Sequence, residues 1–150
     1  MITDSPNRNE AAELFLNLLI ARAYDGAIRD VTSILEGGPP GRKPPQDLIR
    51  LHQWFQNLDN ESRGYVLALI REAVDAAVFG CLVFLDGLAG GYPVEKPSDF
   101  ALHFQVYEDK RSRKSNSPEV SVRLNPVSTT DEDLHDMFRW ILQERAEHEE

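Results

Sequence analysis

The segment that most constrains the fold is an almost entirely apolar stretch, AVDAAVFGCLVFL, at residues 73–85. Its uncharged part begins after Asp75 and spans ten residues, whereas a helix needs about 20 to cross the hydrocarbon core of a membrane. A helix that is apolar on nearly all sides is instead typical of the centre of a globular domain. We therefore expect a buried central helix that begins after a cap at Asp59 or Asn60 and ends near Leu85.

Two more helices are expected before this central helix. Apolar residues recur at helical spacing over 9–36, which predicts a long first helix with a kink near Gly26. The next segment, residues 36–45, is expected to end that helix, because Gly37 can adopt the left-handed conformation and four prolines forbid continuation. A second helix over 45–58 is predicted by apolar residues three or four positions apart: Leu48, Leu51, Phe55 and Leu58.

Beyond the glycine-rich segment 87–91, the hydrophobic period changes from helical to alternating. Apolar and polar residues alternate over 100–106 and again over 120–124, which predicts two antiparallel strands. The connection between them, 109–118, is basic and carries no apolar anchor, so we expect a mobile loop.

A last helix is expected to start at Thr129 or Thr130, with Glu132 and Asp133 at the spacing of a capping box. Its apolar residues fall on one face: Leu134, Met137, Phe138, Ile141 and Leu142. The sequence thus predicts a mostly helical α+β fold, in which about four helices pack with a two-stranded antiparallel sheet.

Composition and charge narrow the functional classes. A chain of 150 residues, 41% of them hydrophobic, is expected to form a single globular domain over 1–150, with loose ends at 1–8 and 146–150. The net charge of −9 repels phosphate backbones, so nucleic acid is not expected as a partner. The N-terminal region has neither the basic start nor the apolar core of a signal peptide, and Cys81 is the single cysteine. We therefore expect a cytoplasmic protein without a membrane partner.

Two carboxylates, Asp75 and Asp86, flank the apolar stretch and raise the question of a catalytic pair. On one helix they would stand about 16 Å apart along the axis, which is too far for two carboxylates to act on one bond. Arg71 lies four residues before Asp75 and is expected to pair with it, while Asp86 precedes Gly87 and fits the end of the helix. Structural roles are expected for both, although either can join a site with residues from elsewhere.

No catalytic, cofactor-binding or metal-binding motif is present. The sequence has no CxxC, HExxH or HxH spacing. Cys81 lies among apolar neighbours, which favours an inert, buried thiol. His135 and Asp136 are adjacent on the predicted last helix, so their side chains are expected to point in different directions. We therefore expect no catalytic residue, no metal and no cofactor.

The last helix also carries an acidic strip that contains a large aromatic residue. At about 100° per residue, five side chains fall within an arc of roughly 80° beside the core stripe: Asp133, Asp136, Trp140, Glu144 and Glu147. Tryptophan is a frequent anchor of protein interfaces, and surrounding carboxylates attract a basic partner. We predict a partner-binding face here; the alternative is that Trp140 packs in the core while the acids are solvated.

Two short motifs carry a resemblance to known proteins. FLDG at residues 84–87 follows a helix, alternating strands come next, and LHDMF at residues 134–138 opens the last helix. This order resembles small acidic bacterial proteins of unassigned function, among them the immunity proteins of polymorphic toxin systems. The resemblance covers about half of the chain and implies a non-enzymatic inhibitor that binds one toxin domain.

Three functional hypotheses follow. The first is a protein-binding module, such as an immunity-type inhibitor, whose acidic surface engages a basic partner such as a toxin domain. The second is a small-ligand-binding protein or enzyme with a pocket between the third helix and the sheet, using Asp75, His103 or His135. The third is a structural subunit without activity of its own.

Overall fold

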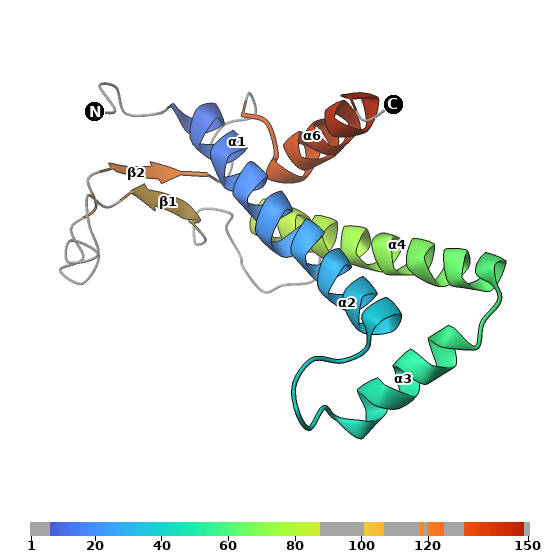
Figure 1. The fold of residues 1–150 in the computed structure, drawn as a ribbon. Helices are drawn as coiled ribbons and strands as arrows, with labels where there is room; N and C mark the ends of the chain where they lie inside the picture. The colour runs from blue at the N-terminus through green and yellow to red at the C-terminus, as the bar shows by residue number, and fades with distance from the viewer. Residues whose placement is uncertain (1–6, 88–100, 107–117, 119, 125–130, 149–150) are drawn as a thin grey trace. The chain divides into compact units, whose positions relative to one another are not determined.

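A computed structural model describes residues 7–87, 101–106, 118, 120–124 and 131–148 (Figure 1). These residues form a mostly helical α+β fold with a two-stranded antiparallel sheet, which confirms the predicted fold class. The chain divides into two compact units, one of Met1–Leu18 with Phe79–Glu150 and one of Leu19–Val78. We call them the hairpin unit and the three-helix unit and describe each by itself. The prediction of a single domain over 1–150, with loose ends, stays a prediction.

The first helical run has three parts: α1 (Arg8–Leu19), a π-helical segment η1 (Ile20–Tyr24) and α2 (Asp25–Gly37). Its span confirms the long helix predicted over 9–36. Near the position of the predicted kink, the helix contains the π-helical segment, which ends just before Gly26; segments of this kind are a known cause of helix bending. The helix end was predicted one residue early: the positive φ of 87° occurs at Gly38 instead of Gly37, because the helical hydrogen bonds continue through Gly37.

In the three-helix unit, α3 (Gln46–Gln56) is tied to the end of α2 by side chains. The His52 ring nitrogen Nδ1 lies 2.9 Å from the carbonyl oxygen of Leu35. Gln56 donates from Nε2 to the carbonyl oxygens of Leu35 and Glu36, each at 3.1 Å. These bonds satisfy carbonyl groups that a helix end leaves without an intrahelical partner.

The third helix predicted from the sequence is α4 (Asn60–Leu85). Asp59 caps it: Oδ1 accepts a hydrogen bond from the Ser62 backbone N–H at 2.8 Å, and Oδ2 accepts one from the Ser62 hydroxyl at 2.8 Å. One of the two predicted caps is thus confirmed. Hydrogen bonding to Ser62 lowers the pKa of Asp59 below its ordinary value, because these bonds favour the charged carboxylate.

We predict that Asp59→Ala lowers the melting temperature at neutral pH by removing this cap. Because the folded-state pKa is lowered, the ionised carboxylate stabilises the fold above its unfolded pKa, and this stabilisation is lost as the pH falls through the folded value. Thermal unfolding of both proteins between pH 7 and pH 3 should show a difference that shrinks in the acidic range. A difference that stays constant over that range contradicts the proposed contribution of the charge.

The expectation that α4 is a buried central helix is wrong. Leu82 is the one residue of α4 that is buried; Tyr65 and Leu69 are exposed, and so is Cys81, which was expected to be buried. The apolar pattern shows which residues of a helix can be buried. Whether they are buried depends on which other elements pack against the helix, and the sequence of the helix does not show that. No helix in the described part of the chain is long and apolar enough to cross a membrane.

In the hairpin unit, β1 (His103–Val106) and β2 (Val120–Arg123) form the predicted antiparallel pair, with Phe104 opposite Val122. The pairing continues beyond the strands, because the Leu124 N–H donates to the Leu102 carbonyl oxygen at 2.8 Å. Arg8 donates from Nε to the Leu124 carbonyl oxygen at 3.0 Å and so ties the start of α1 to the hairpin (Figure 1). The predicted mobile loop lies, apart from Pro118, outside the described residues.

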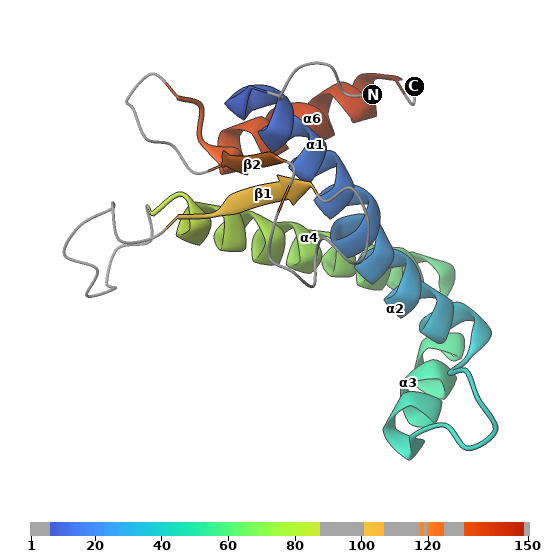
Figure 2. The ribbon, with the colours of Figure 1, turned by 90° about the vertical axis from the view of Figure 1, so that its left-hand side faces the viewer.

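The last helix, α6 (Leu134–His148), lies beside α1 in the hairpin unit (Figure 2). The predicted core stripe is confirmed at four of its positions, while Leu142 is partly exposed. The buried positions on the two helices are Ala11, Ala12 and Leu16 on α1 and Leu134, Met137, Phe138 and Ile141 on α6. The predicted start at Thr129 or Thr130 falls outside the described residues, and the helix itself begins at Leu134.

Candidate functional site

Asp86 is the residue that positions the start of α6. It directly follows the last residue of α4, and its side chain is fully buried. Oδ1 accepts the backbone N–H of Leu134 and Oδ2 accepts that of His135, each at 3.0 Å. The carboxylate thus caps a helix that begins 48 residues later in the chain. It satisfies two free N–H groups and places a negative charge at the positive end of the helix.

The same carboxylate orients the His135 ring. Nδ1 of His135 lies 2.8 Å from Oδ2 of Asp86, so this nitrogen carries the hydrogen and donates it. The Phe79 ring packs edge-on against the imidazole, with centroids 5.4 Å apart, and the Arg139 guanidinium lies over Phe79 at 4.5 Å. With 13% of its side chain exposed, the imidazole is held in one orientation that leaves Nε2 as the outward nitrogen.

Nε2 of His135 approaches Asp136, with 3.5 Å between Nε2 and Oδ1. The expectation that these adjacent side chains point in different directions is therefore wrong. Their Cα–Cβ bonds do diverge on the helix, but both side chains are long enough for their tips to meet in its first turn.

Asp133 completes a cluster with these two residues. The potential ligand atoms of Asp133, His135 and Asp136 all lie within 4.8 Å of one another. Partial burial raises the pKa of Asp133 above its ordinary value, and repulsion from the Asp86 carboxylate adds to this effect. Within the described residues, these three are the ones that could hold a metal ion.

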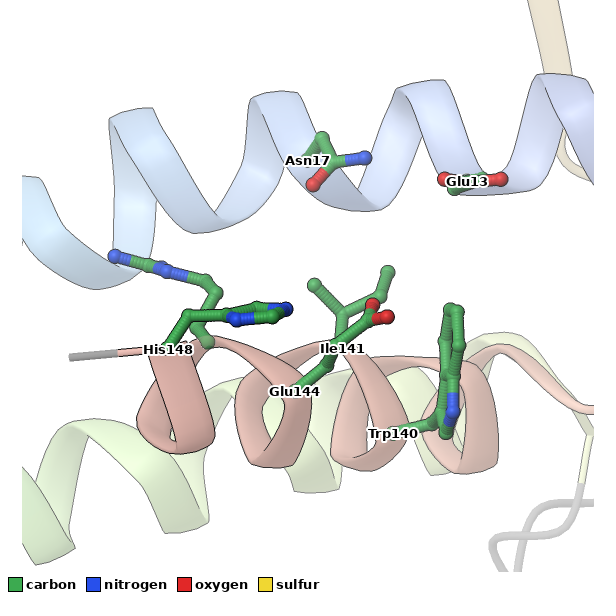
Figure 3. Close-up of a pocket in the computed structure, with 7 residues that line it drawn as sticks. Glu13, Asn17, Trp140, Ile141, Glu144 and His148 are labelled. Atoms are coloured by element: carbon green, nitrogen blue, oxygen red, sulfur yellow. The ribbon is translucent and has the colours of Figure 1, made fainter. Parts of the chain in front are cut away.

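A second feature of the hairpin unit is a pair of open grooves beside Trp140, whose side chain is 55% exposed. One groove has a volume of about 450 Å³ and runs between α1 and α6, where Trp140 and Glu144 face Glu13 and Asn17 (Figure 3). The other has a volume of about 440 Å³, and its acidic residues are Glu10, Glu13, Glu132 and Asp136. Trp140 is common to both, so the exposed indole stands among carboxylates from two helices.

The structure brings together most of the predicted partner-binding residues. Trp140 and Glu144 line the first groove, and Trp140 and Asp136 line the second. Asp133 precedes α6 and is partly buried, while Glu147 is exposed and accepts a hydrogen bond from Gln143 Nε2 at 3.2 Å. The sequence did not predict the contribution of α1. Its acids were visible, but nothing in the local pattern indicates that α1 and α6 are neighbours.

The other candidate residues lie outside this surface. Asp75 is partly buried on α4 in the three-helix unit and interacts with neighbouring groups; its predicted ion pair with Arg71 stays a prediction. His103 is exposed on β1, with Nδ1 3.4 Å from the Ser121 hydroxyl. Neither groove includes Asp75, His103 or His135.

The two motifs that carry the resemblance meet in space, since Asp86 belongs to FLDG and His135 to LHDMF. This contact explains why both motifs matter to the fold, and it assigns no activity to them. Comparison with family models, with curated protein sequences and with solved structures found no match.

Proposed function

We propose that this chain is a non-enzymatic protein-binding module, of the kind found among immunity-type inhibitors, that engages a basic partner through an acidic surface on α1 and α6. The observation that carries the proposal is the exposure of Trp140 between two grooves lined by carboxylates. The sequence predicts a partner-binding face from the residues of α6 alone. The acidic residues of α1 extend this surface.

An exposed tryptophan provides much of the binding energy that such a surface needs. Tryptophan can bury 150–250 Å² of surface, and each Å² of apolar surface removed from water contributes roughly 25 cal/mol. Its side chain is rigid, so ordering it costs less conformational entropy than ordering a long flexible chain. A partner that covers the indole therefore gains affinity without remodelling the helix.

The surrounding charges favour a basic partner. Glu13, Asp136 and Glu144 lie along the grooves that share Trp140, and the whole chain carries a net charge of −9. A field of one sign accelerates the association of an oppositely charged protein and disfavours acidic competitors. The association rate is expected to fall as salt is added, because salt screens these exposed charges.

The chain offers a matched test, because it contains two tryptophans, Trp140 and Trp54, with exposed fractions of 55% and 49%. We predict that Trp140→Ala weakens binding of a captured partner by about 30-fold or more, equivalent to at least about 2 kcal/mol. Trp54→Ala should leave the affinity unchanged, since Trp54 lies on α3. The partner is first captured from native lysate with the wild-type chain, and dissociation constants are then measured for the three proteins.

Thermal unfolding of both variants separates loss of binding from loss of fold. An exposed residue away from caps and networks changes stability little, so both variants should remain folded. A folded Trp140→Ala protein that binds as tightly as the wild type contradicts the proposal. Equal losses of affinity in the two variants also count against it, because they indicate a general dependence on exposed aromatic residues.

A further inference from the structure

The cluster of Asp133, His135 and Asp136 brings two carboxylates and an imidazole together, and the positive charge of Arg8 also acts on Asp133. Asp86 and not Asp133 caps the first N–H groups of α6, and within the described residues the Asp133 carboxylate accepts no hydrogen bond. In the neutral ring, Nδ1 donates to Asp86, so Nε2 presents a lone pair. That lone pair faces the carboxylate of Asp136 at 3.5 Å, which is repulsive unless a positive charge lies between them.

We propose that Asp133, His135 and Asp136 bind a divalent first-row transition cation, with Zn²⁺ as the representative ion, and that Asp86 is the buried partner that fixes the imidazole ligand. The cation is bound by Nε2 of His135 and by one oxygen from each carboxylate, and water completes its coordination. The proposal does not rest on the proposed function, since it concerns the isolated chain.

The donor set suits this class of ion. Imidazole and carboxylate together are common ligands of zinc and its neighbours, whereas magnesium and calcium prefer oxygen ligands alone. Bonds of about 2.0–2.2 Å hold two ligand atoms no more than about 4.4 Å apart, and the three donors already lie within 4.8 Å of one another. Nε2 of His135 and Oδ1 of Asp136 are already 3.5 Å apart, so rotation of the Asp133 and Asp136 carboxylates is what closes the remaining gap.

Asp86 supplies the feature that an ordinary surface cluster of acids lacks. A metal-bound histidine usually donates its other ring N–H to a carboxylate, which fixes the tautomer and makes the ligand more basic. The buried Asp86 carboxylate does this for His135 at 2.8 Å. Its charge also opposes the positive end of α6, which would otherwise disfavour a cation there.

The competing explanation is a protonated His135 that balances the carboxylates without any metal. The two explanations differ in metal uptake, which a calorimeter measures directly. The chain is prepared without a histidine tag, treated with a chelator and then titrated with Zn²⁺. A parallel titration with Co²⁺ reports nitrogen and oxygen coordination through visible absorption. We expect one Zn²⁺ per chain and Co²⁺ bands that Zn²⁺ abolishes.

The decisive variant is Asp136→Asn, because its exposed side chain can change without loss of the fold. It should weaken Zn²⁺ binding by at least about 10-fold, and His135→Gln should weaken it further. Glu132→Gln is the matched control: it removes the same charge beside the cluster from an exposed residue and should bind Zn²⁺ as the wild type does. If His135→Gln does not fold, Asp136→Asn and Glu132→Gln still decide.

Three results overturn the proposal. The first is absence of saturable Zn²⁺ binding to the folded chain. The second is binding that Asp136→Asn leaves unchanged, since the ion then lies at another site. The third is an equal loss in Asp136→Asn and Glu132→Gln, which indicates attraction by net charge alone.

Discussion

Asp86→Ala is expected to lower the free energy of unfolding by about 3–5 kcal/mol, because each donor left without its acceptor costs about 1–3 kcal/mol. The wild-type carboxylate accepts three hydrogen bonds, two from the backbone of α6 and one from His135. In the variant, these three N–H donors are still removed from water but no longer have an acceptor, which destabilises the fold. The start of α6 also loses its only described side-chain cap.

The two tryptophans allow the loss to be located. Trp140 lies on α6 in the hairpin unit and Trp54 on α3 in the three-helix unit, so fluorescence in Trp54→Phe and Trp140→Phe backgrounds reports each unit separately during urea unfolding. The matched control is Asp136→Ala, which removes an exposed carboxylate on the other side of the same imidazole and should change stability by about 0.5 kcal/mol or less. Equal effects of the two substitutions are incompatible with a special role for Asp86.

The sequence predicted the elements that local patterns determine. Apolar residues at helical spacing located the helices to within a few residues, and alternation located the strands later paired in β1 and β2. A cap at Asp59 was also predictable, because its acceptor and donor are three residues apart. In each case the interacting groups are neighbours in sequence, so spacing alone carries the information.

The cap of α6 was not predictable in this way. Sequence analysis placed capping groups next to the helix, at Thr129 or Thr130, whereas Asp86 provides the acceptor from 48 residues away. Asp86 was correctly expected to have a structural role, but at the end of the preceding helix. Which of several acids reaches a distant helix end depends on tertiary packing, and one sequence does not determine that.

The prediction that α4 is buried was wrong for a related reason. A nearly uniform apolar composition indicates that a helix can be buried on any side, so it does not indicate which side is covered. Tyr65 and Leu69 are exposed, whereas Leu82 on the same helix is buried. Conversely, α6 has one clear apolar stripe, and four of its five predicted core residues are buried. An amphipathic pattern thus predicts orientation better than a strongly apolar one.

Phe55→Ala should produce the second large loss, about 3–5 kcal/mol, because it removes a buried aromatic ring and leaves a cavity. Phe55 is the buried residue of α3, and the Arg63 guanidinium lies over its ring at 5.7 Å, so the substitution also removes a cation–π contact. The adjacent residue gives the control, since Trp54 is about half exposed on the same helix and Trp54→Ala should cost clearly less. Circular dichroism during urea unfolding measures both variants without relying on Trp54 fluorescence.

The Phe55→Ala variant also tests whether residues 1–150 behave as a single domain. Phe55 lies in the three-helix unit, so in a single cooperative domain its loss must lower the unfolding midpoints reported by Trp54 and Trp140 by the same amount. Units that unfold independently would instead keep the Trp140 midpoint at its wild-type value while the Trp54 midpoint falls. Asp86→Ala, in the hairpin unit, provides the reciprocal measurement. Coincident shifts in both variants support the predicted single domain, and a shift confined to the probe of the mutated unit refutes it.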